Sequence, residues 1–167
     1  MKTYVIMISR HFPTWHPKAG EVTKFTNKIL STFWNRDNPN AWKKIHTIQE
    51  NYDLWLKRIS EVQSGKAVLS LRFWDGKPYK STQTVLIDLT KDDNVGIQRL
   101  EVSFIPNKYF MAYEFKIDGL AFITDDIAYN EGLTKEDFCE WFRRADFSKP
   151  FALIHFTPKR YGFTISW

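Results

Sequence analysis

The segment from Lys44 to Gln49 holds the residue types that could carry out chemistry in this chain. It reads Lys-Ile-His-Thr-Ile-Gln, and strict strand alternation would place Lys44 and His46 on one face and Thr47 on the other. If Lys44 instead lies on a turn before the strand, the Lys44 and Thr47 side chains can face one cleft. A partly desolvated lysine loses its proton readily and can activate a neighbouring hydroxyl. The alternative interpretation is a solvated lysine followed by an edge-strand threonine.

Basic and aromatic residues interleave around this segment and in a second stretch further along the chain. The residues concerned are Trp42, Lys43, Arg72, Trp74, Lys77 and Tyr79. Flat rings interleaved with cations suit single-stranded RNA or a flipped base, which bind by stacking and by phosphate contacts. The alternative is that Trp74 and Tyr79 pack beneath a helix while the lysines are solvated.

The bulk composition is that of a globular protein with a modest basic excess. The chain has 167 residues, of which 17% are aromatic, and 24 Lys and Arg against 19 Asp and Glu give a net charge of +5. A positive charge is compatible with a polyanionic partner, and surplus aromatic residues favour a surface that stacks on flat ligands. Residues 1–8 are apolar but too short for a signal core or a membrane span. We therefore expect a cytoplasmic protein that does not enter a membrane.

Metal and cofactor chemistry find little support in the sequence. Cys139 is the single cysteine, which excludes an intramolecular disulfide and a cysteine metal site. The four histidines are scattered, and none pairs with another at the spacing of ligands on a helix. A phosphate-cradling glycine loop and a dinucleotide-binding fingerprint are both missing. We therefore expect no bound metal and no cofactor.

The periodicity of the apolar residues, together with the cap and turn residues between them, predicts an α+β protein. Helices are expected at residues 21–33, at 52–62 behind an Asn51 N-cap and before Gly65, and from Thr134 onward. Strands are expected at residues 3–8, 67–74, 84–89, 99–104, 109–117 and 151–156, with one more at 161–167. Residues 44–49 form a turn that leads into a further strand. Two helices, a run of antiparallel strands, a helix and a closing strand indicate a curled sheet.

This order of elements, together with Lys44-x-x-Thr47, resembles the ASCH family of the PUA-like superfamily. The family motif Gly-x-Lys-x-x-Thr-x-Arg follows the first helix, and the corresponding positions here are Trp42, Lys44, Thr47 and Gln49. The resemblance covers about residues 25–156. It implies one domain over residues 1–167, a PUA-like, mostly antiparallel β-barrel with flanking helices. On that interpretation residues 34–42 are an inserted loop and residues 157–167 a C-terminal extension.

The resemblance also implies roles for three residues. Small bacterial amidohydrolases of that superfamily act on 4-acetylcytidine, with the motif Thr as nucleophile, the Lys as its activator and a Glu before the late helix assisting proton transfer. Glu131 stands at that place in this chain. Gln49 replaces the motif Arg, removing a fixed positive charge, and Trp42 replaces the motif Gly. These departures allow a different ligand, or loss of the reaction.

Three functions therefore remain open from the sequence. The first is binding of RNA or a modified nucleoside in a cleft near Lys44 and Thr47, with Gln49 and the aromatic and basic residues named above as contacts. The second is hydrolysis of an acylated nucleoside by Thr47, Lys44 and Glu131. The third is a protein-interaction accessory role that uses exposed aromatic residues. The sequence leaves the oligomeric state open.

Overall fold

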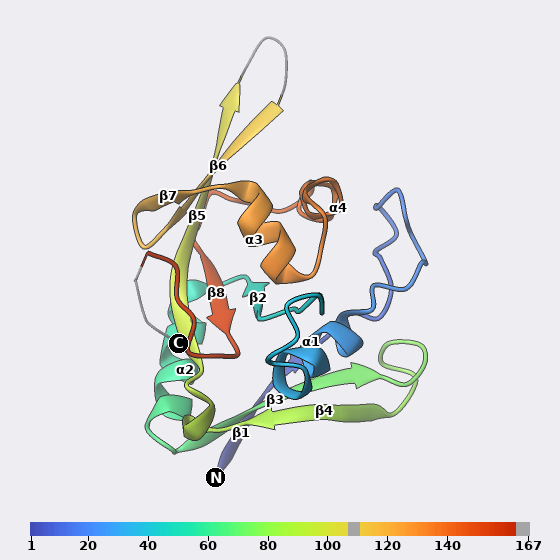
Figure 1. Ribbon diagram of the computed structural model, residues 1–167, viewed down its shortest axis with the longest axis vertical. Helices are drawn as coiled ribbons and strands as arrows, with labels where there is room; N and C mark the ends of the chain where they lie inside the picture. The colour runs from blue at the N-terminus through green and yellow to red at the C-terminus, as the bar shows by residue number, and fades with distance from the viewer. Residues whose placement is uncertain (107–110, 163–167) are drawn as a thin grey trace.

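Two β-sheets carry the strands of the described part of the chain. The computed structural model describes the backbone of residues 1–106 and 111–162 and, within these, the side chains outside residues 104–112. The first sheet has the order β1 (Lys2–Met7), β3 (Ala67–Trp74), β4 (Gln83–Leu89). The second has the order β2 (His46–Gln49), β8 (Phe151–His155), β5 (Gly96–Pro106), β6 (Met111–Ile117), β7 (Leu120–Phe122) (Figure 1).

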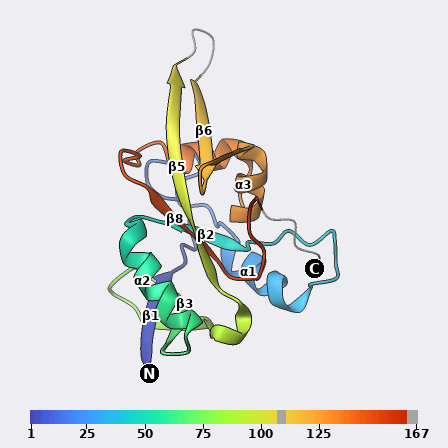
Figure 2. The same ribbon diagram turned by 90° about the vertical axis from the view of Figure 1, so that its left-hand side faces the viewer.

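Helices cover and connect these sheets. They are α1 (Phe25–Trp34), α2 (Tyr52–Gln63), α3 (Thr124–Glu131) and α4 (Lys135–Trp141), with a short 3-10 turn, η1 (Lys91–Asp93), before β5. Helix α2 packs against β3 of the first sheet and against β5 and β8 of the second, and α3 packs against β2, β6 and α4. Helices α2 and α3 lie on opposite sides of the strands β5 and β8 (Figures 1 and 2). No helix among the described residues is both long and apolar enough to cross a membrane.

The predicted α+β class is confirmed, but the predicted β-barrel is wrong, because the strands form two sheets that do not close into a barrel. The second sheet is antiparallel throughout its named pairings, whereas β1 pairs in parallel with β3. The two sheets remain separate because each buries apolar side chains against a helix that they share. Trp55, Ile59 and Val62 of α2 are buried, together with Leu69 and Leu71 of β3. Burial against α2 thus takes the place of closure into a barrel.

The first helix begins later than residues 21–33 predict. Val22 forms an isolated bridge with His11 and is 59% exposed, so it does not belong to the buried face of α1. The Thr23 hydroxyl accepts a hydrogen bond from the Phe25 N–H (3.2 Å), and the helix begins at Phe25. An apolar residue at helical spacing was therefore misleading, because the chain still runs as an extended bridge at that point.

Local capping signals locate two other helices correctly. The Asn51 side chain accepts from the Leu54 N–H (3.2 Å) at the start of α2, and Gly65, with a φ of +79°, follows its end. The Thr134 hydroxyl accepts from the Asp137 N–H (3.1 Å) at the start of α4. Helix α3 is not predicted by the sequence pattern, because its eight residues bury only Ile127, Ala128 and Glu131 and so show no long apolar stripe.

Most of the remaining strand predictions agree with the structure, and the one that begins at Tyr161 does not in its described part. Predicted strands 67–74, 84–89, 99–104 and 151–156 correspond to β3, β4, part of β5 and β8. The strand predicted at 109–117 corresponds to β6 from Met111, and its first two residues lie outside the described range. For the strand predicted at 161–167, Tyr161 and Gly162 lie in a turn, and the rest is outside the described residues.

Candidate functional site

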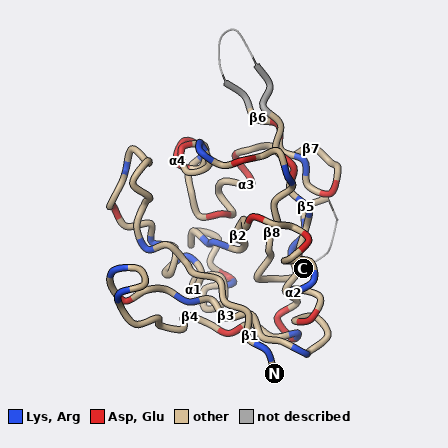
Figure 3. The backbone as a smooth tube through the Cα atoms, turned by 180° about the vertical axis from the view of Figure 1, so that it is seen from behind, with Lys and Arg blue, Asp and Glu red and all other residues tan. Residues whose placement is uncertain are grey.

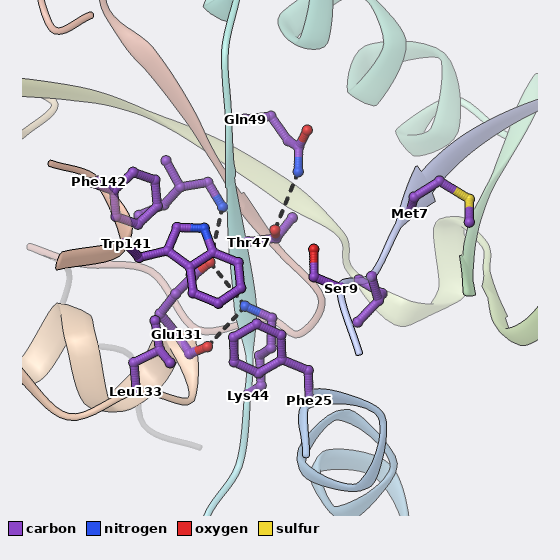
Figure 4. A pocket seen from close by; sticks show the side chains of 12 residues that line it. Met7, Ser9, Phe25, Lys44, Thr47, Gln49, Glu131, Leu133, Trp141 and Phe142 are labelled. Carbon is purple, nitrogen blue, oxygen red and sulfur yellow. Dashed lines mark hydrogen bonds and ion pairs between the residues drawn. The ribbon is translucent and has the colours of Figure 1, made fainter. Parts of the chain in front are cut away.

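A pocket of about 100 Å³ brings the three predicted catalytic residues together. Lys44, Thr47 and Glu131 all line it, and so do Gln49 and Ser9 (Figure 4). The pocket lies where β2, the C-terminal end of α3 and the residues after β1 meet. Its walls are completed by apolar and aromatic side chains, namely Met7, Ile8, Phe25, Ile48, Leu133, Trp141 and Phe142.

Lys44 is placed by hydrogen bonds to two helices. Its backbone N–H donates to the carbonyl of Lys28 in α1 (3.1 Å), and the Ile45 N–H donates to the carbonyl of Asn130 in α3 (2.9 Å). Strand β2 begins only at His46. Lys44 therefore precedes the strand, which is the arrangement that lets its side chain and that of Thr47 face one pocket.

Glu131 is placed by the end of α3. It is the last residue of that helix, and Gly132 follows with a φ of +88°, a conformation that favours glycine. A Cβ atom at Gly132 would lie 3.3 Å from Lys44 Cβ and 3.3 Å from Lys28 Cδ. The glycine therefore ends the helix and also lets the Lys44 segment approach it closely.

Lys44 and Glu131 form a buried ion pair. Lys44 Nζ lies 2.9 Å from Glu131 Oε1 and donates to the Glu131 carbonyl at 2.8 Å, and their side chains are 3% and 6% exposed. The ammonium also lies 4.5 Å from the centre of the Phe25 ring. Since the C-terminal end of a helix carries partial negative charge, the end of α3 favours a cation here.

Burial and pairing act against each other on the two charges. Burial lowers the pKa of Lys44, although the attraction of Glu131 opposes this shift. Burial alone would raise the pKa of Glu131, but Lys44 and His46 together hold it below its usual value. The pocket thus contains a firmly ionised carboxylate beside a lysine that gives up its proton more easily than a solvated one.

Thr47 contributes a hydroxyl whose hydrogen has no acceptor among the described residues. Gln49 Nε2 donates a hydrogen bond to Thr47 Oγ1 (3.3 Å), so the threonine oxygen is an acceptor in that contact. Lys44 Nζ makes its hydrogen bonds to Glu131, and none of the described hydrogen bonds joins it to Thr47 Oγ1. The two side chains line the same pocket (Figure 4), but proton transfer between them requires the lysine to leave part of its ion pair.

Two of the predicted ligand contacts lie beside the pocket and not in it. Trp42 stacks on Tyr129, with ring centres 5.4 Å apart and planes 11° from parallel, and its Nε1 donates to the Tyr129 carbonyl at 2.9 Å. The ammonium of Lys28 lies 3.8 Å from the centre of the Trp42 ring. Lys43 Nζ donates to the carbonyl of Arg36 (2.8 Å). Trp42 therefore fastens α1 and α3 to the Lys44 segment.

The other four predicted contacts lie around the turn between β3 and β4. Arg72 Nε donates to Ser70 Oγ (2.9 Å), and the rings of Trp74 and Tyr79 lie 5.2 Å apart. Lys77 is exposed, and Tyr79 is 89% exposed. None of these four residues lines the pocket. The structure thus separates the residues that the sequence suggested could form one binding surface.

Several residues of the site went unrecognised in the sequence. His46 and Tyr161 belong to a buried hydrogen-bonded group behind Glu131, and Trp15 lines a groove of about 420 Å³ next to the pocket. The groove shares Ile48, Gln49, Trp141 and Phe142 with the pocket. Tyr161 lies 115 residues from His46, so no local spacing could reveal this contact.

Lowering the pH should destabilise the fold because of two buried histidines. Burial lowers the pKa of His46 and that of His155 from the ordinary value of 6.5. Below about pH 6.5 the unfolded chain binds protons that the folded chain excludes, so the free energy of unfolding decreases as the pH is lowered. Each histidine adds at most about 1.4 kcal/mol per pH unit, and Glu131 adds to the loss under more acidic conditions.

This pH dependence is measurable by urea unfolding between pH 5 and pH 8. The His46→Asn variant should show about half the slope of the wild type, since it retains only one of the two buried imidazoles. A free energy of unfolding that stays constant or rises on acidification would contradict the assignment of neutral buried histidines.

The described residues hold no group of three or more His, Cys, Asp and Glu side chains that could bind a metal ion. No protein-family model matches the chain, and neither curated proteins nor solved structures give a significant match. The arrangement of Lys44, Thr47 and Glu131 in one pocket is therefore the basis on which a function is assigned.

Proposed function

We propose that this protein is an ASCH-like, PUA-related amidohydrolase that binds a modified nucleoside and cleaves an acyl amide on its base. The observation that carries the proposal is that Lys44, Thr47 and Glu131 line one pocket, although 87 residues separate Lys44 from Glu131. A hydroxyl nucleophile, an amine base and a carboxylate that transfers a proton can together hydrolyse an acyl amide.

The first half of the reaction forms an acyl-enzyme. Lys44 passes a proton to Glu131, across a contact of 2.9 Å, and becomes an amine. The amine takes the hydroxyl proton of Thr47 while Thr47 Oγ1 bonds to the acyl carbon. The bond between that carbon and the exocyclic nitrogen then breaks, and the nitrogen leaves with the proton held by Glu131. These steps depend on the lowered pKa of Lys44, which lets the lysine give up its proton and act as the base.

The second half releases the acid. Glu131 takes a proton from the attacking water as the water oxygen bonds to the acyl carbon, the ester bond to Thr47 Oγ1 breaks, and the oxygen of Thr47 takes a proton from Lys44. Glu131 then returns its proton to Lys44, which restores their ion pair across the contact of 2.9 Å, and the product acid loses its remaining proton to solvent and leaves as a carboxylate. The two halves together consume one water molecule and leave the protein unchanged.

The shape of the site suits this division of the ligand. A volume of about 100 Å³ accommodates an acyl amide but is smaller than the few hundred Å³ typical of sites for whole ligands. The adjoining groove of about 420 Å³ presents the rings of Trp15, Trp141 and Phe142. A base and its sugar can therefore lie along the groove while the acyl amide enters the pocket.

Incubation with 4-acetylcytidine tests the proposed function directly. Wild-type protein should release cytidine and acetate in equal amounts, in proportion to protein and time, which chromatography can follow. A matched nucleoside with a methyl group in place of the acetyl group lacks the carbonyl and should not be cleaved. If the wild type releases no cytidine at high protein concentration, the proposed reaction is wrong for this substrate.

A second function is favoured by the turn between β3 and β4, which offers exposed Tyr79 and Lys77 away from the pocket. Basic and acidic residues are interspersed along most of the backbone (Figure 3). We therefore place the proposed RNA contact at this turn alone. We propose RNA binding there as the competing activity, with Tyr79 stacking on a base and Lys77 contacting a phosphate.

This competing activity predicts binding of a single-stranded RNA oligonucleotide that weakens as salt rises. Replacing Lys77 with alanine should reduce the slope of log affinity against log salt by about one, whereas Tyr79→Ala should weaken binding at every salt concentration. Fluorescence anisotropy measures both effects. Undetectable binding at low salt would remove RNA as a ligand of this turn.

A further inference from the structure

The two carboxylate oxygens of Glu131 have different partners. Oε1 lies 2.9 Å from Lys44 Nζ and accepts from the Ile48 N–H at 3.3 Å. Oε2 lies 2.6 Å from Nδ1 of His46, whose side chain is fully buried. One oxygen of Glu131 thus faces the lysine, while the other is held from behind by an imidazole.

A tyrosine and an asparagine hold His46 in place. Tyr161 Oη lies 2.7 Å from His46 Nε2, and Asn130 Nδ2 donates to the same tyrosine oxygen at 2.8 Å. Asn130 precedes Glu131 in α3. The four side chains therefore close a ring of contacts that runs from α3 through Tyr161 and β2 and back to α3.

These contacts select one form of the His46 ring. An ionised carboxylate can only accept, so the hydrogen of the neutral imidazole lies on Nδ1, where it is donated to Glu131. His46 Nε2 then carries a lone pair, which accepts the single hydrogen of the Tyr161 hydroxyl, while the tyrosine oxygen accepts from Asn130. Burial raises the pKa of Tyr161, which keeps the phenol protonated, and burial lowers the pKa of His46, which keeps the ring neutral.

We propose that His46, oriented by Tyr161, is a positioning residue that keeps Glu131 ionised in the resting protein and presents only its Oε1 to Lys44 for proton exchange. This role rests on the proposed function of the pocket. A neutral donor at Oε2 stabilises the carboxylate without competing for the Lys44 proton, and it fixes the oxygen at which that proton is exchanged. His46 does not itself line the pocket, and it acts on the pocket through its contact with Glu131.

The charged and titratable groups around His46 define what its replacement can change. Glu131 and Tyr161 contact its ring directly, Lys44 and Lys159 act on it through their charge, and the ring of His155 lies 5.7 Å away. Of these groups, only Glu131 accepts the hydrogen on Nδ1. Loss of that hydrogen should therefore raise the pKa of Glu131 and leave its ion pair with Lys44 as the main remaining support.

Three variants separate positioning from packing. His46→Asn places an amide N–H near the position of Nδ1, whereas His46→Phe keeps a ring and removes the donor. Tyr161→Phe leaves the side chains of His46 and Glu131 unchanged and removes only the tyrosine hydroxyl. Carbon-13 NMR of the glutamate carboxyls and nitrogen-15 NMR of the imidazoles read the ionisation of Glu131 and the protonation of each His46 nitrogen in folded protein.

The wild type should show a hydrogen on Nδ1 and a lone pair on Nε2 of His46. The pKa of Glu131 should be higher in His46→Phe than in His46→Asn, and the pKa of His46 should rise in Tyr161→Phe. For hydrolysis of 4-acetylcytidine, His46→Phe should lower kcat by about 100-fold with KM changed less than about threefold, and move the acidic limb of the kcat profile to higher pH. His46→Asn should restore most of kcat.

Each result bears on one of the two proposals. An unchanged pKa of Glu131 in His46→Phe, or a wild-type hydrogen on Nε2 of His46, overturns the positioning role whatever the activity. If the wild type fails to cleave 4-acetylcytidine while the NMR shifts appear as expected, the positioning of Glu131 stands and the proposed reaction is wrong. If His46→Phe does not fold, the comparison of Tyr161→Phe with the wild type gives the same decision through the His46 nitrogens.

Discussion

Replacing Thr47 with alanine is expected to lower kcat for acyl-amide hydrolysis by about 1,000-fold or more, because the nucleophile is removed. Thr47→Ser keeps a hydroxyl and should stay within about tenfold of the wild type. The change should leave the fold intact, since the threonine oxygen makes one long hydrogen bond, to Gln49 (3.3 Å). Steady-state kinetics with 4-acetylcytidine and a thermal unfolding curve for each variant measure both effects.

Ser9 provides the matched control for this prediction. Its hydroxyl also lines the pocket, on the side formed by the residues after β1 (Figure 4). Ser9→Ala should retain most of the activity if Thr47 is the nucleophile. Full activity in Thr47→Ala would show that water attacks the acyl carbon directly, and loss of activity confined to Ser9→Ala would move the nucleophile to Ser9.

Replacing Glu131 with glutamine is expected to lower the free energy of unfolding by about 3–5 kcal/mol. The substitution preserves shape but leaves the ammonium of Lys44 buried without a negative partner, at a side chain that is 3% exposed. The carboxylate accepts from Lys44 at one oxygen and from His46 at the other. Glutamine has a single side-chain oxygen, so its NH2 group must face either Lys44 or His46, and one of the two hydrogen bonds is lost. Urea unfolding at neutral pH measures the change.

Two further variants test this explanation. The double variant Glu131→Gln with Lys44→Met should be more stable than Glu131→Gln alone, since removal of the second charge relieves the uncompensated burial. Glu101→Gln breaks an exposed ion pair with Arg99, whose side chains are 49% and 50% exposed, and should change the free energy of unfolding by less than about 1 kcal/mol. If Glu131→Gln and Glu101→Gln change the free energy of unfolding equally, then burying Lys44 without a negative partner does not carry the expected electrostatic cost.

Local features of the sequence predicted much of the secondary structure. Asn51 and Gly65 bracket α2, Thr134 caps α4, and alternation between residues 67 and 74 predicts β3, all of which the structure confirms. These signals work because a cap or an alternating strand depends on residues within a few positions of one another. The same reasoning failed at Val22, where the chain pairs with His11 and does not enter a helix.

The site was only partly predictable. The Lys44-x-x-Thr47 spacing allowed both side chains to face one cleft, and the backbone contacts of Lys44 with α1 and α3 show how this occurs. Glu131 was suggested by a family resemblance and not by any local pattern, and its contact with Lys44 is a property of the folded chain. Trp42, expected to contact a ligand, stacks on Tyr129. A side chain able to bind a base is equally able to pack against the protein itself.

The sequence by itself determined an α+β protein with Lys44 on a turn or strand between two helices, and a hydroxyl three residues later. The tertiary structure alone decided that the sheets remain open around α2, that Glu131 pairs with Lys44 across 87 residues, and that Tyr161 orients His46 behind it. The reason is physical. Caps and periodicity depend on neighbouring residues, whereas contacts between remote residues depend on which surfaces bury one another after the chain has closed long loops.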